Sequence, residues 1–328
     1  MARLVAAFGA SHSLMLTAQL EDWCGNFHSR DRAMRHVDAD GNWCSYDDLL
    51  TKAPPDATDR IRRDLLEQRF ADVNAAIARL TQDIQAAKLD AIVVLGDDQK
   101  ELFQDWNMPA IGVYYGDTIR NAKRDTAEPK DWAARARLRR YEDHEDANYP
   151  CNADLALHLI EMLQREQFDL SAMKRLAEGQ SEGHAYSFVH RFFMRENVVP
   201  IVPVFLNAYY PPNQPTPARC LALGAAIARA VASFPDEIRV GLLASGGLSH
   251  FVVDEQFDRA FIDALRRHDA AWMRSIPLHK LMSGSSEMRN WICMAGGLGD
   301  LSLDWVSYNP GYRTEALTGT GLCFASWH

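Results

Sequence analysis

The chain has 328 residues, of which 47% are hydrophobic and 24% are charged, enough to bury the core of one large domain or of two smaller ones. The formal net charge is −9 and no basic block stands out, so no nucleic-acid partner is expected. No apolar run reaches the roughly 20 residues that cross a membrane, and the first residues read as a strand rather than as a signal peptide. The six cysteines lie far apart without a CxxC pair, which indicates reduced thiols, a cytoplasmic protein and no zinc ribbon.

Short apolar runs alternate with longer helical patterns along the chain. The runs lack period-two alternation, which is typical of strands covered on both faces, and they are Leu4–Phe8, Ala91–Leu95, Ile111–Tyr115, Val198–Phe205 and Val240–Ala244. Apolar residues spaced three and four apart predict helices over Ile61–Ala87, Ala153–Leu163, Ala218–Ala232 and Glu255–Arg267. This order predicts an α/β fold with a central, mostly parallel sheet flanked by helices.

Two segments interrupt this alternation. Glu21–Pro55 is rich in turn residues, and Asp117–Pro150 is highly charged. We expect both to be insertions of loops and helices within a single domain that spans residues 1–328. Loops of this kind often border the active site in open α/β sheets, so both insertions are expected near the site.

Three predicted strands end in residues that can bind a metal or transfer protons. The first strand ends in Gly9-Ala10-Ser11-His12-Ser13, another in Gly96-Asp97-Asp98-Gln99, and a third in Ser245-Gly246-Gly247-Leu248-Ser249-His250. Ligands of such sheets bind beyond the carboxyl ends of the strands. Imidazole together with carboxylate is the ligand set of a non-haem iron(II) site, which leaves positions open for substrate and oxygen.

Each of these residues, taken alone, also has a purely structural interpretation. A histidine after a strand is commonly a turn residue, Asp97-Asp98 commonly caps a helix or forms a turn, and Gly246-Gly247 commonly forms a tight turn. His184 is ordinary in isolation. Other signatures are missing: the sequence has no GxxxxGK[ST] loop, no HExxH helix, no GxSxG elbow and no GxGxxG after the first strand. Most nucleotide-binding and serine-hydrolase functions are excluded on this ground.

Several motifs occur in an order that resembles one family of enzymes. They are Ser11-His12-Ser13, Ala153–His158, Gln167–Leu170, Gly183-His184, Val202–Asn207, Tyr210-Pro211-Pro212, Arg219–Gly224, Ser245–His250 and Ser283-Gly284-Ser285 with Glu287 and Trp291. In this order they resemble the class III extradiol dioxygenases, which include the catalytic β-subunit of protocatechuate 4,5-dioxygenase and single-chain relatives that act on gallate and 3-O-methylgallate. The resemblance runs nearly end to end, apart from the two insertions.

The resemblance implies an iron(II) enzyme that inserts both atoms of dioxygen into a catechol-type aromatic acid and opens its ring. His12 and Glu287 match the family's metal ligands. His250 matches the acid/base, since an imidazole can take and return a proton near neutral pH. His184 matches a histidine that hydrogen-bonds the bound oxygen or a substrate oxygen.

The third metal ligand departs from the family's pattern. The family's second metal histidine sits in an Asn-Asp-His run, which reads Asp97-Asp98-Gln99 here. Gln99 therefore occupies the ligand position, and its amide oxygen can bind iron(II), although less well than imidazole. Asp98 and Glu101 are the alternatives.

The resemblance also indicates the substrate and the partners. The expected substrate is 3-O-methylgallate or a related lignin-derived, gallate- or protocatechuate-like compound. Its carboxylate needs a cationic or polar partner, for which Lys123, Arg124 and Arg135 in a lid formed by Asp117–Pro150 are candidates. The insertions would take the covering role that a separate α-subunit has in the protocatechuate enzyme, and we expect a homodimer. The alternatives are a redox-inactive metallohydrolase on the same scaffold and a non-catalytic member of the family.

Overall fold

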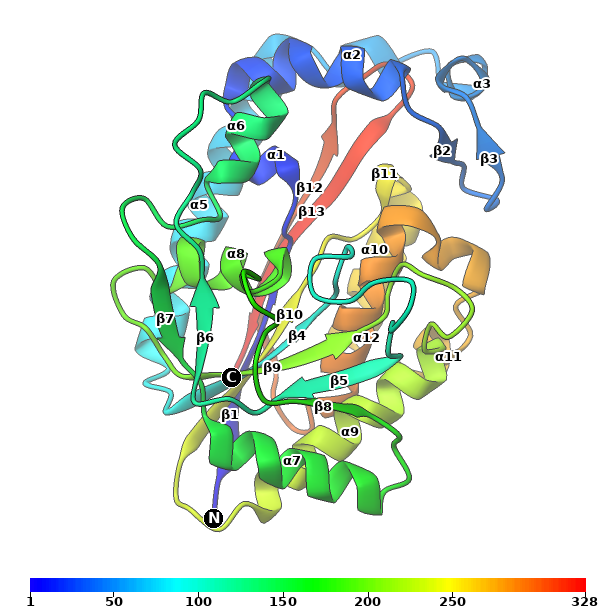
Figure 1. Ribbon diagram of the computed structural model, residues 1–328. Coiled ribbons are helices and arrows are strands. Elements are labelled where there is room, and N and C mark those ends of the chain that lie inside the picture. Colours follow the sequence, from blue (N-terminus) through cyan, green and yellow to red (C-terminus); the bar gives the residue numbers. More distant parts are fainter.

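The computed structural model describes residues 1–328 and has one large central sheet with helices on both of its faces (Figure 1). The strand order is β11-β13-β1-β10-β4-β9-β5-β8, and β12 pairs with β13 outside this path. The strands are β1 (Arg3–Ala10), β4 (Ala91–Gly96), β5 (Ile111–Tyr114), β8 (Ser171–Met173), β9 (Ile201–Leu206), β10 (Arg239–Ser245), β11 (His250–Val252), β12 (Leu303–Tyr312) and β13 (Thr318–Trp327).

The four strands at the centre of the sheet run parallel. β1 pairs with β10, β10 with β4, and β4 with β9 in parallel register. Every residue of β4 and β9 is buried, because helices cover both faces of these strands, and this explains their continuous apolar sequences. Parallel neighbours end at the same edge, so the residues that follow β1, β10, β4 and β9 come together there.

Helices of both layers bury their apolar faces on the sheet. Buried residues of α7, α9, α10, α11 and α12 form one core with one face, and those of α1, α5 and α8 form a second core with the other. The bounds are α1 (Leu14–Thr17), α5 (Arg63–Ala86), α7 (Ala153–Arg165), α8 (His184–Phe193), α9 (Pro217–Ser233), α10 (Glu255–Arg266), α11 (Ala270–Arg274) and α12 (Met288–Gly297). Side chains at the N-caps begin α7, α9 and α10, where Asn152, Thr216 and Asp254 accept hydrogen bonds from backbone N–H groups of the first turn.

Helices α2 (Phe27–Arg32) and α6 (Trp132–Leu138), one from each predicted insertion, lie beyond the carboxyl edge of the central strands, whereas β6 (Thr118–Asn121) and β7 (Ala147–Pro150) of the second insertion lie beside the sheet (Figure 1). The first insertion also contains a π-helix (Asp22–Asn26), β2 (His36–Val37), β3 (Trp43–Cys44) and α3 (Tyr46–Lys52), and α4 (Ala57–Arg60) follows it. The rings of Phe27 and Trp132 pack edge to face with centroids 4.6 Å apart, so the two insertions contact each other.

The structure confirms the predicted α/β class and shows that the sheet is mixed. Each predicted apolar run overlaps a strand, and each predicted helix overlaps a helix. The pairing is antiparallel where β13 joins β1 and where β5 joins β9, and it is parallel again between β5 and the end strand β8. The hairpin of β12 and β13 was not predicted, because Pro310, Gly311, Gly319 and Gly321 interrupt its pattern. None of the helices combines the length and the apolar character that a membrane crossing requires.

Close packing of α9 on α12 depends on glycine. A Cβ atom on Gly224 would lie 1.7 Å from the backbone oxygen of Cys293, and one on Gly296 would lie 2.1 Å from the backbone oxygen of Leu221. Backbone atoms cannot move aside as a flexible side chain does. The two helices therefore approach at a distance that only glycine permits, and this places the first turn of α12 over the strand ends.

We predict that Gly224→Ala lowers the free energy of unfolding by about 1–3 kcal/mol or more, because the added methyl group overpacks the interface of α9 and α12. Urea unfolding followed by circular dichroism measures the change. Gly25→Ala is the control, since no atom lies within 4 Å of its added Cβ. Equal midpoints for Gly224→Ala and the unchanged protein would contradict this account of the packing.

Candidate metal centre and active site

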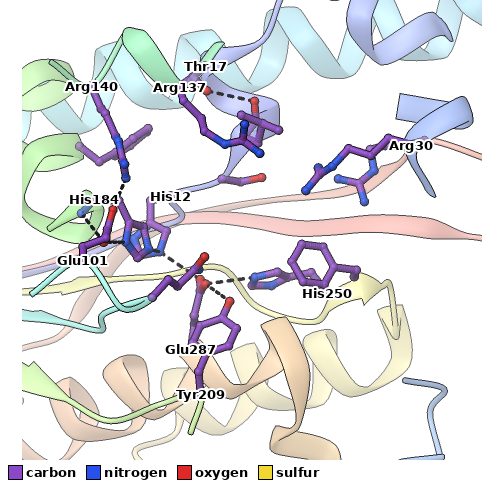
Figure 2. Close-up of a pocket in the computed structure, with 16 residues that line it drawn as sticks. His12, Thr17, Arg30, Glu101, Arg137, Arg140, His184, Tyr209, His250 and Glu287 are labelled. Atoms are coloured by element: carbon purple, nitrogen blue, oxygen red, sulfur yellow. Dashed lines mark hydrogen bonds and ion pairs between the residues drawn. The ribbon is translucent and has the colours of Figure 1, made fainter. Parts of the chain in front are cut away.

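Four parallel strands deliver the candidate residues to one edge of the sheet. His12 follows β1, Asp97 follows β4, Tyr209 follows β9, and the loop that ends in His250 follows β10. Together with His184 and Glu287, the side chains of His12, Tyr209 and His250 line one cavity of about 320 Å³ (Figure 2). This is the carboxyl edge at which open α/β sheets bind their ligands.

Glu287 reaches this edge from the N-cap position of α12. Glu287, Asn290 and Trp291 are spaced three and four residues apart, so they share one face of the helix. Asn290 Nδ2 donates to Asp97 Oδ1 (3.0 Å) and to the Ser245 carbonyl (2.7 Å), and Trp291 Nε1 donates to the Gly246 carbonyl (2.7 Å). These bonds fix the turn against β4 and β10 and hold the Glu287 carboxylate among the histidines.

Four side chains from separate segments form a compact set of donor atoms. His12, Asp97, His184 and Glu287 each place a ligand atom within 4.8 Å of the others. Nε2 of His12 lies 3.0 Å from Nε2 of His184, 3.3 Å from Glu287 Oε2 and 3.7 Å from Asp97 Oδ1. Ligand atoms about 2.1 Å from one divalent ion lie about 3.0–3.6 Å apart. The spacing of this set therefore fits a single metal ion.

His12 is hydrogen-bonded through Nδ1 to Ser245, and its Nε2 faces the donor set, where it contacts His184 Nε2. Ser245 Oγ donates to the Ala185 carbonyl at 2.8 Å, so it can accept the proton of His12 Nδ1, which lies 3.0 Å away. The proton of a neutral His12 then sits on Nδ1. Nε2 presents its lone pair to the donor set, as in a metal-binding histidine whose other nitrogen is held by a hydrogen bond.

Asp97 is a carboxylate with one unused oxygen. Its side chain is fully buried, and Oδ2 has no hydrogen-bond partner. Burial and the nearby Glu287 carboxylate raise the pKa of Asp97 to about 6, although His12 and His184 lower it. A buried oxygen without a partner is costly, and a cation in the donor set would satisfy it. This orphan atom is the second observation that fits a metal ion.

His184 is held by a carboxylate on its far side. Glu101 Oε2 accepts hydrogen bonds from His184 Nδ1 (2.5 Å) and from its backbone N–H (3.0 Å), and Arg140 pairs with the other oxygen. Burial alone would lower the pKa of His184, but Glu101 and Asp97 raise it to about 9. Burial would raise the pKa of Glu101, yet His184 and Arg140 hold it well below its usual range.

His250 lies beside the donor set and not within it. Nδ1 of His250 donates to the Leu248 carbonyl at 2.8 Å, and Nε2 lies 3.2 Å from Glu287 Oε1. Burial lowers the pKa of His250, but Glu287 outweighs this effect and the net shift is upward. Gly284 leaves room for the ring, because a Cβ there would lie 2.0 Å from His250 Cδ2. Nε2 is thus the atom of His250 that can exchange a proton in the cavity.

Gln99, Asp98 and Glu101 have different surroundings. Gln99 lines the cavity, but its side chain is exposed and makes no hydrogen bond. The Asp98 carboxylate accepts the backbone N–H groups of Glu101, Leu102 and Phe103, so it serves as the cap of a turn. Glu101 is engaged by His184 and Arg140. The structure brings His12, His184, His250 and Glu287 together, with Gln99 at the wall.

The three cations suggested for the substrate carboxylate do not line the cavity. Arg124 pairs with Asp143 (3.2 Å), and Arg135 pairs with Asp22 (3.4 Å). Lys123 is exposed. The arginines that do line the cavity are Arg30, Arg137, Arg140 and Arg313. Both insertions are charged, and nothing in the sequence distinguishes a cation that faces inward from one that faces solvent.

Tyr209 was also missed, although a signal for it exists. Its hydroxyl donates to Glu287 Oε1 at 2.5 Å. Burial and the adjacent Glu287 raise the pKa of Tyr209 well above its usual value, so the hydroxyl keeps its proton. Tyr209 follows the predicted strand Val198–Phe205 by four positions. The rule that singled out His12 and His250 at strand ends would have included it.

Comparison with known proteins identifies the family of this chain. The family model described as the catalytic LigB subunit of aromatic ring-opening dioxygenase matches residues 67–322. The chain is 28% identical to a gallate dioxygenase of Pseudomonas putida over 188 residues, which cover 51% of each protein. It is 34% identical over 99 residues to a 2,3-dihydroxyphenylpropionate/2,3-dihydroxicinnamic acid 1,2-dioxygenase of Comamonas testosteroni, over 30% of this chain and 29% of that protein.

The aligned regions span about half of the first relative and less than a third of the second. The family match is longer and takes in Asp97, His184, His250 and Glu287, while His12 precedes it. The resemblance drawn from the motifs is therefore confirmed at the level of the family. This chain belongs to the family of catalytic LigB subunits of aromatic ring-opening dioxygenases.

Proposed function

We propose that the protein is a non-haem iron(II) extradiol dioxygenase, which opens the ring of a catechol-type aromatic acid and incorporates both atoms of dioxygen. The observation that carries this proposal is the buried set of His12, Asp97, His184 and Glu287 with His250 at its side, in a chain of the LigB family. The proposed substrates are 3-O-methylgallate and related lignin-derived compounds. The gallate dioxygenase among the relatives supports this substrate class.

His12 and Glu287 are the proposed core of the iron site. For the third ligand, the surroundings favour Asp97 over Gln99, because Asp97 Oδ2 is buried without a partner whereas Gln99 is exposed. Imidazole and carboxylate suit iron(II), and such sites leave coordination positions open. These residues would hold an iron(II) ion, which would supply the positive charge that favours a deprotonated catechol and the redox chemistry that dioxygen requires.

His250 is the proposed acid/base. Its Nδ1 proton is held by the Leu248 carbonyl, so Nε2 takes the proton of a phenolic hydroxyl and returns it later in ring opening. Glu287 Oε1, 3.2 Å away, stabilises the imidazolium that forms. Tyr209 donates to this same oxygen and keeps the carboxylate oriented towards His250.

His184 is the proposed hydrogen-bond partner of an oxygen atom of the substrate or of dioxygen. Glu101 fixes the ring through Nδ1, so Nε2 faces the cavity beside His12. Arg140 pairs with the other oxygen of the Glu101 carboxylate. The ring therefore cannot turn away without breaking its bonds to Glu101, and it is positioned before the substrate arrives.

Oxygen uptake tests the proposed function. The protein is loaded with iron(II) under anaerobic conditions and assayed with an oxygen electrode on 3-O-methylgallate, gallate, protocatechuate and a biphenyl catechol. We expect one dioxygen to be consumed per ring opened, with both atoms of ¹⁸O₂ found in the product by mass spectrometry. Glu287→Ala should lose bound iron and oxygen uptake together. Turnover without oxygen uptake would instead indicate a metallohydrolase, and an iron-loaded protein inert on every compound would indicate a non-catalytic member.

Iron retention distinguishes the candidates for the third ligand. Asp97→Asn should retain less iron after anaerobic dialysis than Gln99→Ala, because it weakens a buried donor whereas Gln99 lies at the exposed wall. Metal analysis of the dialysed proteins gives the result. Asp105→Asn makes the same chemical change at an exposed position and should retain iron normally. If Gln99→Ala loses the most iron, the ligand is Gln99.

Removal of His250 should separate proton transfer from metal binding. His250→Ala is expected to retain iron and to bind a catechol anaerobically, while oxygen uptake falls by about 10²–10⁴-fold, the usual contribution of general acid–base catalysis. The ultraviolet band of the catechol should shift less on binding, since no base takes its proton. His144→Ala, at an exposed histidine, serves as the control. Loss of iron from His250→Ala would mean that His250 is a ligand.

A further inference from the structure

The cavity has a second charged end, away from the metal donors. Figure 2 shows Arg30 and Arg137 entering it from the side opposite to Glu287 and Tyr209. Arg313 lines the cavity as well. Arg30 belongs to α2 in the first insertion, and Arg137 belongs to α6 in the second. Both insertions thus contribute a guanidinium group to the same end of the cavity.

Two of these guanidinium groups have no anionic partner within the protein, although Arg30 lies over the ring of Phe27 with its Cζ 6.0 Å from the ring centroid. Arg313 is neutralised, because its Nε and Nη2 donate to the buried carboxylate of Asp31 at 2.9 and 3.2 Å. Arg30 and Arg137 form no ion pair and no side-chain hydrogen bond. Asp131 is the other acid whose field reaches Arg30, but its carboxylate caps α6 by accepting from the backbone N–H of Ala134.

Such an arrangement favours a bound anion. Arginine keeps its charge in proteins, and the half-buried Arg30 and the exposed Arg137 carry like charges, which repel each other. Burial and the neighbouring Arg313 lower the pKa of Arg30. This shift has the direction expected when a cation is surrounded by other positive charges. The excess of positive charge is local, because the chain as a whole carries −9. An anion that accepts from both arginines would remove the repulsion.

We propose that Arg30 and Arg137 together bind the carboxylate of the aromatic substrate and select acids over uncharged catechols. This inference rests on the proposed function, in which the two ring hydroxyls face the iron site. A ring whose carboxylate lies away from its hydroxyls then points that group to the opposite end of the cavity. The planar forks of two arginines suit a carboxylate, because each can donate two N–H groups to it.

The two helices that carry these arginines are held in place before the substrate arrives. Phe27 and Trp132 pack against each other between α2 and α6, and Arg135 pairs with Asp22 across the same contact. Arg139 donates to the Thr17 carbonyl at 3.2 Å and ties the end of α6 to α1. Binding of the carboxylate therefore does not require the two segments to be brought together, which lowers its entropic cost.

A charge-matched pair of ligands tests the proposal. Anaerobic titration calorimetry on the iron(II)-loaded protein compares 3,4-dihydroxybenzoate with its uncharged amide, 3,4-dihydroxybenzamide. The unchanged protein should bind the acid at least about tenfold more tightly, as expected for charge-assisted hydrogen bonds. Arg30→Gln and Arg137→Gln should each weaken binding of the acid by about tenfold and leave binding of the amide unchanged. In the double variant the two affinities should become equal.

Arg32→Gln is the matched control, because Arg32 is an exposed residue of α2 that does not line the cavity. It should bind both ligands normally. The amide also reports whether each variant keeps an intact site. Unchanged preference for the acid in the double variant would overturn the proposal and leave the proposed function standing, provided that oxygen uptake continues. Failure of the unchanged protein to bind either ligand would overturn both.

Discussion

The site is organised by the need to bury the charge of Glu287. This carboxylate is 1% exposed, and a buried charge is stable only when partners surround it. Its partners come from separate elements: His12 after β1, Tyr209 after β9, and the Gly247 N–H and His250 after β10. Burial raises the pKa of Glu287, but His250 and His12 hold it well below its usual range. The residues of the proposed iron site and the proposed base are therefore assembled around one carboxylate.

Asp97 and Glu287 have opposite surroundings, and this contrast explains why the set suits a cation. Glu287 is fully supplied with donors, whereas Asp97 receives one hydrogen bond from Asn290 and keeps a second oxygen without a partner. Two carboxylates in one buried site repel each other, and the pKa of Asp97 is raised as a result. A divalent cation between the carboxylates of Asp97 and Glu287 would remove this repulsion. A glutamine at position 99 is therefore compatible with the proposed metal site.

Much of the fold could be predicted because the apolar runs of the central strands are continuous. The same reasoning placed His12 and His250 at one edge, since parallel strands share their carboxyl ends. Reasoning from apolar runs did not predict β12 and β13, because their glycines and proline interrupt the strand pattern. It also did not predict α8, the short helix that begins at His184. The sequence also could not show which of Asp97, Asp98 and Gln99 faces the other donor atoms. Their roles depend on which side chain turns inwards at the end of β4, and adjacent polar residues carry no periodicity that reveals this.

The second insertion acts on both ends of the cavity through one short helix. Arg137 lies in the last turn of α6 and Arg140 lies in the turn that follows this helix, and both line the cavity. Arg140 holds Glu101, which holds His184 beside the metal donors, while Arg137 stands at the cationic end. Because α6 packs on the first insertion through Phe27 and Trp132, a displacement of this helix would alter both ends together. The distance between the proposed iron site and the proposed anion site is therefore set by the packing of the two insertions. A change in this packing would alter which aromatic acid fits without any change in the proposed metal ligands.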